Sequence, residues 1–338
     1  MSAAEEIVTE APAVEAVPKR AMTLGYGTSL AVLAALIIIP LFVKNFIIFQ
    51  MTMLLIYALA VMALNILTGG SGQFSLGQSA FYAVGAYTTA VLMEHFNVNY
   101  ALTLPIAGVV CFGFGFLFGQ PALRLSGVYL ALATFALATA MPQLLKLNFL
   151  EHWTGGVQGL VVTKPDAPFG LPMSQDMWLY YFTLVVVLAI YIFSVNLLRS
   201  RSGRAFMAIR DNEIAASAMG VDVALYKTLA FGVSAAITGI AGSLGAIAVQ
   251  FVAPDSYTIV LAISLFLGMV VGGVGWLPGS FIGAAFIIFV PNIAEGISKG
   301  LSGAVFGVLL FLIIFLVPHG ARQVAMVAQQ LLSKVRKT

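Results

Sequence analysis

Long apolar runs recur along almost the whole chain, and they restrict its fold more than any other feature. A helix needs about 20 apolar residues to cross roughly 30 Å of hydrocarbon, and several runs reach that length. The 338 residues are 61% hydrophobic and only 9% charged, with a mean hydropathy of +1.02. This composition excludes a soluble protein, and the strand alternation of membrane barrels is absent. We therefore predict an all-α polytopic membrane protein.

About ten runs are long enough to span a bilayer. The predicted spans cover residues 26–46, 50–68, 76–95, 101–119, 127–147, 177–198, 228–250, 257–275, 279–297 and 301–318. Ten spans place both termini on the same side of the membrane. A disordered acidic tail (1–20) is expected before the transmembrane domain (21–320), and a basic tail (321–338) after it.

Basic residues lie mostly on one side of this layout. The other side holds only four of the 16 Lys and Arg residues, namely Lys44, Lys146, Lys164 and Lys299. The positive-inside rule makes the richer side cytoplasmic. Both termini and a polar insert at 199–228 are therefore expected in the cytoplasm, and a loop rich in Gly and Pro (148–176) outside. This external loop is expected either to dock a partner or to cap the helices.

Two glycine-rich stretches interrupt the apolar pattern, GGSGQFSLGQSAFYAVGAY (69–87) and GGVGWLPG (272–279). Irregular backbone at membrane depth is tolerated where it lines a cavity or is buried in protein, and paired interruptions in transporters indicate the substrate path. The alternative is that each stretch is a turn between helices. The neutral groups predicted to line the path are Asn65, Gly72, Gln73, Ser75, Gln78 and Ser79. Because no ionisable relay is visible within the spans, ion coupling is not expected.

The polar insert reads as two short helices. Residues 203–210 form the first, and Asp211 or Asn212 can cap the second, with Glu213 in its first turn. Two further end signals follow, a C′ glycine at Gly220 and an N-cap for the next span at Asp222. The second helix is too short to be stable alone, so it must rest on the bundle or on a partner. The simpler alternative is a basic loop that only sets the topology.

The insert also carries a family resemblance. Its segment EIAASAMG (213–220) matches the E-x-A-A-x-x-x-G core found in permease subunits of ABC importers. Three longer segments resemble, in the same order, the branched-chain amino acid permeases of the LivM type: LNILTGGSGQFSLGQSAFYAVGAY, GRAFMAIRDNEIAASAMGV and GMVVGGVGWLPGSFIGA. The resemblance covers roughly residues 64–284.

The resemblance implies that the second helix of the insert is a coupling helix seated in a groove of an ATPase subunit. The residues that it assigns to this contact are Arg204, Arg210, Asp211, Glu213, Ala215, Ala216 and Gly220. It also implies two ATP-binding-cassette subunits, a second homologous permease, an external solute-binding protein and a bacterial inner membrane. The chain lacks the phosphate-binding pattern G-x-x-x-x-G-K-[ST], so ATP hydrolysis is expected on the partners, with no catalytic residue or cofactor here.

The expected function is the permease subunit of an ABC importer that moves branched-chain amino acids or a related small solute inward. A urea or short-amide importer of the same family is one alternative. An ATP-independent secondary transporter or facilitative channel is another. An integral-membrane enzyme is disfavoured because no catalytic cluster or metal-ligand spacing is visible, and no nucleic-acid partner is expected.

Overall fold

The computed structural model describes residues 34–122, 125, 127–168, 173–297 and 307. The predicted tails (1–20 and 321–338) lie outside these residues, as does the span 301–318 apart from Gly307. The chain divides into two compact units, Met1–Lys44 and Asn45–Thr338. In the first unit, a short helix at 34–38 runs into a 3₁₀ helix at Ile39–Leu41. The α-helical ladder stops there because Pro40 has no backbone N–H.

The described part of the second unit is almost entirely helical. Its elements are α2 (Asn45–Leu64), the π-helix η2 (Asn65–Gly70), α3 (Gln78–Phe96), α4 (Tyr100–Ala122), α5 (Val128–Leu145), α6 (Glu151–Thr154), β1 (Leu160–Val161), α7 (Gln175–Arg199), α8 (Arg201–Asp211), α9 (Glu213–Ala218), α10 (Val223–Val249), β2 (Phe251–Val252), η4 (Pro254–Tyr257), α11 (Ile259–Gly272) and α12 (Gly279–Ile297). The two short strands pair antiparallel, with Leu160 opposite Val252.

Six helices in the described part of the chain are long and apolar enough to cross a membrane. They cover Asn45–Gly70, Tyr100–Gln120, Val128–Leu145, Gln175–Arg199, Val223–Val249 and Pro254–Gly272. A shorter apolar helix follows at Gly279–Ile293. The structure is therefore consistent with the predicted all-α polytopic membrane protein. The total of ten spans stays a prediction, because residues 26–33 and most of 301–318 lie outside the described residues, and neither α3 nor α12 is among the six.

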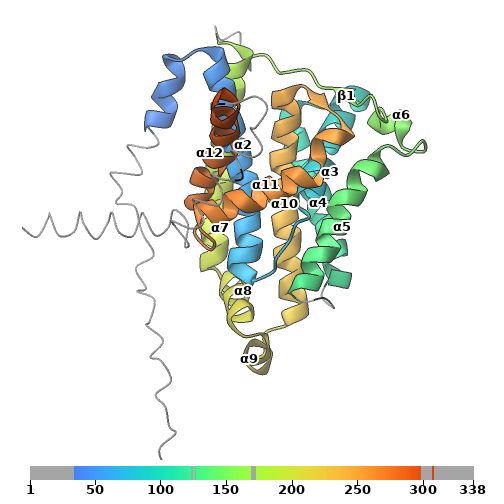
Figure 1. The fold of residues 1–338 in the computed structure, drawn as a ribbon, viewed down its shortest axis with the longest axis vertical. Coiled ribbons are helices and arrows are strands. Elements are labelled where there is room, and N and C mark those ends of the chain that lie inside the picture. The colour runs from blue at the N-terminus through green and yellow to red at the C-terminus, as the bar shows by residue number, and fades with distance from the viewer. Residues whose placement is uncertain (1–33, 123–124, 126, 169–172, 298–306, 308–338) are drawn as a thin grey trace, which may run out of the picture. The chain divides into compact units, whose positions relative to one another are not determined.

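Helix α10 is the centre of the bundle, packed against α2, α3 and α4 (Figure 1). Small residues let these helices approach closely. A Cβ added at Gly115 of α4 would overlap the Cβ of Ala235 on α10, and one at Gly268 of α11 would lie 3.1 Å from the carbonyl oxygen of Gly283 on α12. Glycine at these positions therefore allows the close approach of the helices.

The two long connections lie at opposite ends of the helices. Figure 1 shows α8 and α9 at one end of the bundle, and α6 and β1 at the other. The end that carries α6 and β1 is tied down by the β1–β2 pair and by an ion pair from Lys146 to Asp255 at 2.6 Å. The insert and the loop 148–176 are thus separated by the length of the bundle. Which end faces the cytoplasm stays a prediction.

Candidate functional site

The insert leaves the bundle at the end of α7 and folds as the predicted helix pair. Ser200 has extended backbone geometry, and its Oγ accepts a hydrogen bond from the Gly203 N–H at 3.3 Å. This cap starts α8 at Arg201, two residues before the predicted start, because a serine cap satisfies one of the free N–H groups of the first turn.

Helix α9 begins at the predicted cap. The Asn212 side chain accepts a hydrogen bond from the Ala215 N–H at 3.0 Å, and its backbone is extended. Of the two caps that the sequence allowed, Asn212 is the one used. Glu213 occupies the first turn, where the helix dipole favours an anion.

The end of α9 is also as predicted. Gly220 has a φ of +82°, a conformation that side chains with a Cβ rarely adopt. The Gly220 N–H donates to the Ser217 carbonyl at 3.0 Å, and the Val221 N–H donates to the Ala216 carbonyl at 3.1 Å. This pair of bonds is the Schellman motif. Asp222 then caps α10 through the Leu225 N–H, at 3.0 Å.

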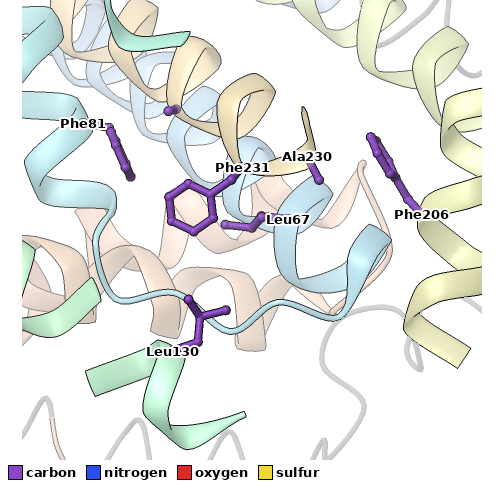
Figure 2. Packing of buried hydrophobic residues seen from close by; sticks show 7 residues of the cluster. Leu67, Phe81, Leu130, Phe206, Ala230 and Phe231 are labelled. Atoms are coloured by element: carbon purple, nitrogen blue, oxygen red, sulfur yellow. The ribbon is translucent and has the colours of Figure 1, made fainter. Parts of the chain in front are cut away.

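A buried aromatic ring anchors the insert to the bundle. Phe206 of α8 is 1% exposed and belongs to a cluster with Leu67 and Phe231 (Figure 2). Its ring also meets Tyr226 edge-to-face, with centroids 6.1 Å apart. The sequence analysis missed this residue. The signal that could have found it is the apolar spacing of Phe206 and Ile209, three residues apart on one helix face.

An ion pair joins the start of α9 to α10. The Lys227 Nζ lies 2.5 Å from a carboxylate oxygen of Glu213. The Lys227 side chain is only 10% exposed, whereas that of Glu213 is 51% exposed. A buried ammonium needs a partner of opposite charge. This ion pair therefore compensates the charge of Lys227 and holds α9 against α10. The role of Lys227 was also missed.

Helix α9 and its C-cap expose two large apolar side chains. Ile214 is 84% exposed and Met219 is 85% exposed, and Ala215 is exposed beside them. Ala216 faces the other way and is buried. Large apolar side chains so exposed are typical of contact surfaces.

The remaining predicted coupling residues belong to α8. Arg204 is exposed and donates to the Arg199 carbonyl at 3.2 Å. Arg210 pairs with Asp211 at 2.9 Å and donates a second bond, through Nη1, to the Gly69 carbonyl at 2.8 Å. The insert is therefore bonded directly to the first glycine-rich stretch.

The first glycine-rich stretch leaves helical geometry at 71–77, here called the first break. Gly72 is exposed, with a φ of +74°, and a Cβ there would lie 3.0 Å from the Arg210 Cγ. Gln73 is 7% exposed and donates to the Ser71 Oγ at 2.9 Å and to the Lys227 carbonyl at 3.1 Å. Two of the predicted path residues therefore touch the insert.

The other predicted path residues are buried in the bundle. Gln78 donates to the Ser234 Oγ at 3.0 Å and accepts from the Thr238 hydroxyl at 2.6 Å. Ser75 is 1% exposed and its Oγ accepts from the Gly77 N–H at 3.2 Å. Ser79 is fully buried.

Asn65 connects the two glycine-rich stretches. It lies at the start of the π-helix, is 2% exposed, and bonds to residues 273–276, the part of the chain here called the second break (273–278). The Gly275 N–H donates to its Oδ1 at 2.6 Å. Both breaks are connections between helices, as the alternative predicted. The π-helical turn that precedes the first break lies against the second break, through Asn65 and Gly69. Whether these residues line a solute path stays a prediction.

No group of three His, Cys, Asp or Glu residues that could hold a metal ion occurs within the described ranges. The two breaks are held by hydrogen bonds, and Arg210 and Lys227 bond the first break and the π-helix before it to a capped insert that exposes apolar side chains.

A family model for the permease component of the branched-chain amino acid transport system matches residues 46–317. That range contains the insert, both breaks and every predicted site residue. The chain belongs to this permease family.

This permease is similar to several curated proteins. The high-affinity branched-chain amino acid transport system permease protein LivM of Salmonella typhimurium is 36% identical, over 66% of this chain and 58% of the relative. Its counterpart in Escherichia coli is 35% identical, with the same coverage. A probable branched-chain amino acid transport permease protein LivH of Methanocaldococcus jannaschii is 26% identical, over 63% of this chain and 69% of the relative.

The alignment covers 58% of each of the first two relatives, so this permease spans somewhat more than half of their length. No solved structure matches it.

Proposed function

We propose that this permease is the membrane-spanning subunit of an ABC importer that moves branched-chain amino acids, or a related small solute, inward. Separate ATPase subunits would supply the energy. The complex would contain two ATP-binding-cassette subunits, a second homologous permease and an external solute-binding protein. It would lie in a bacterial inner membrane with both termini of this permease in the cytoplasm.

One observation carries the proposal. Helix α9 is capped at both ends and held by the Glu213–Lys227 pair, yet it exposes Ile214 and Met219 at one end of the bundle. A helix of six residues is not stable by itself, so the caps and the ion pair are what keep α9 folded at this exposed position. Such a rigid, exposed helix with an apolar outer surface fits a docking element for a partner. The predicted coupling residues Ala215 and Gly220 lie on this element.

The path residues would let solute pass between the breaks. All six are neutral, which suits a path that binds weakly while the solute-binding protein supplies specificity. Neutral groups fit urea or a short amide as well as an amino acid, so the solute class has to be read from the binding protein.

The test is purification of the tagged permease in mild detergent, identification of its partners by mass spectrometry, and uptake by the reconstituted complex. We expect two ATPases and a second permease to co-purify, and uptake to require ATP. A permease that purifies alone and transports in liposomes without ATP would instead be a facilitator or secondary transporter.

The coupling role has a sharper test. Glu213→Arg places a like charge against Lys227, and Gly220→Arg puts a large residue at a positive φ. Both variants should reach the membrane and fail in uptake. Glu94→Arg, an exposed glutamate on α3, is the matched control and should transport. Normal uptake by both insert variants would remove the coupling role.

A further inference from the structure

Asn65 makes an unusually complete set of contacts for one side chain. Its Oδ1 accepts from the Gly275 N–H at 2.6 Å, and its Nδ2 donates to the carbonyls of Gly273, at 3.3 Å, and Trp276, at 3.1 Å. Gly273 and Gly275 both have positive φ, at +102° and +78°. Their backbone groups lie outside regular helix, and a primary amide can serve a donor and two acceptors at once. Asn65 therefore holds the second break in its turn.

The same π-helix contacts the insert four residues later. The Gly69 carbonyl accepts from the Arg210 Nη1 at 2.8 Å. A Cβ at Gly69 would lie 2.5 Å from the Gly275 nitrogen and 2.7 Å from the Asn65 Oδ1. Gly69 is thus in contact with Arg210, Asn65 and the second break together. The last carbonyls of a helix lack partners within the helix, which leaves this one free for Arg210.

A second contact holds the first break itself. The Gln73 Nε2 donates to the Lys227 carbonyl at 3.1 Å, and the Lys227 ammonium is bound to Glu213 of α9. The insert therefore holds the first break at two points, since Arg210 bonds to Gly69 just before it and Lys227 bonds to Gln73 within it. Single π-helical turns inside helices occur frequently at functional sites, and this one carries both Asn65 and Gly69.

We infer that Asn65 and Arg210 are positioning residues that make the two breaks move as one body with the insert. This inference rests on the proposed function, in which partner subunits displace the insert. A displacement of α8 would pull the Gly69 carbonyl through Arg210. Asn65, on the same π-helical turn, would carry the displacement to the backbone of the second break. Without Asn65, only the first break would follow the insert.

The test uses the full reconstituted complex with its ATPases, second permease and binding protein. Its readout is solute imported per ATP hydrolysed, with ATPase binding measured separately. Asn65→Ala and Arg210→Ala should each lower this ratio about tenfold, a typical size for coupling between sites. ATPase binding should be unchanged in Asn65→Ala, because Asn65 is buried away from any partner. Since both residues act through Gly69, the double variant should lose little more than the single ones.

The matched controls are an Asn and an Arg at the same end of the bundle as Asn65 and Arg210. Asn196→Ala on α7 and Arg201→Ala on α8 change exposed side chains and should leave the ratio at the wild-type value. Asn65→Gln, which keeps the amide one methylene further out, should recover part of it. If Asn65→Ala does not assemble, Arg210→Ala still decides, because the Arg210 side chain is 40% exposed and is not needed for the core.

The outcomes separate two failures. A wild-type complex without ATP-driven uptake would refute the proposed function. A wild-type complex that is coupled, with Asn65 and Arg210 variants equally coupled, would overturn the link and leave the proposed function standing. Additive losses in the double variant would show two independent contacts and would also overturn it.

Discussion

Gly85 of α3 and Gly239 of α10 lie backbone against backbone, and a Cβ at Gly85 would overlap the Gly239 carbonyl. One turn along, the Thr89 and Ser243 hydroxyls share a hydrogen bond at 2.5 Å. Helix α10 is the centre of the bundle, so this crossing fixes the spacing of the whole α3–α10 interface. The absence of a side chain at Gly85 is a packing requirement.

Gly85→Ala should therefore destabilise the permease strongly. Rigid backbone cannot yield to the new methyl group, and overpacking of this kind costs about 3 kcal/mol. Gly113→Ala on α4, where a Cβ would meet nothing within 4 Å, is the matched control and should be neutral or slightly stabilising. Thermal unfolding of the two variants in the same detergent measures the difference. Equal melting temperatures would contradict the packing requirement.

Phe206→Ala should loosen α8 from the bundle. Removing a buried phenylalanine costs about 3–5 kcal/mol, and here the loss falls on the contact between α8 and the cluster around Leu67 and Phe231. Hydrogen exchange of residues 201–211 should accelerate while α3 and α4 stay protected. Met207→Ala, next in sequence but 36% exposed, should leave exchange unchanged. Exchange that rises across the whole bundle would mean that Phe206 supports the core in general.

Gly220→Ala should impair transport more than its effect on the fold suggests. A non-glycine residue in this left-handed conformation costs about 1 kcal/mol, and relaxing it would undo the turn that ends α9. Gly127→Ala is the control, because Gly127 has a φ of +55° and a ψ of −121°, with no atom within 4 Å of a built Cβ. Alanine there is at least as strained as at Gly220, but the strain lies outside the insert. ATP-driven uptake should fall several-fold for Gly220→Ala and stay near wild type for Gly127→Ala. Equal uptake by both variants would place α9 outside the coupling step.

Cysteines at Gln73 and Gln78 test the proposed path. Both side chains are buried, at 7% and 0% exposure, so small thiol reagents should react slowly with the resting complex. If turnover raises the open fraction from about 1% to about 10%, the labelling rate should rise about tenfold. Phe74→Cys, at a position 50% exposed, should react in every state, and native Cys111, fully buried, in none. Gln73 and Gln78 variants that stay unlabelled during turnover would be helix-packing residues.

The local features of the insert could be predicted because each depends on a few neighbouring residues. Asn212, Gly220 and Asp222 act on backbone groups within three to five positions of themselves, so their chemistry is visible in the sequence. Small residues commonly mark close helix contacts in membranes, but the sequence does not identify the partner of each one. Nothing in the local pattern indicates that Gly85 meets Gly239.

The residues that anchor the insert to the bundle were missed because their partners are also distant in the sequence. Phe206 and Lys227 lie in a segment that reads as polar and basic, and their burial follows from helices that pack around them. We predicted Gln78 to line the path because its polar side chain lies in an apolar run. In the structure, the Gln78 side chain is hydrogen-bonded to Ser234 and Thr238 of α10, which are far away in the sequence.

The sequence alone determined that the chain is a bundle of apolar helices with one polar insert, because hydrophobic length and helix-end chemistry are local properties. It also carried the segments by which the family is recognised. Only the tertiary structure decided that the π-helix before the first break meets the second break through Asn65, and that Arg210 joins this π-helix to the insert. Those contacts join side chains to backbone groups of residues far apart in the chain. Such groups find each other only after the helices have packed, so no spacing in the sequence specifies them.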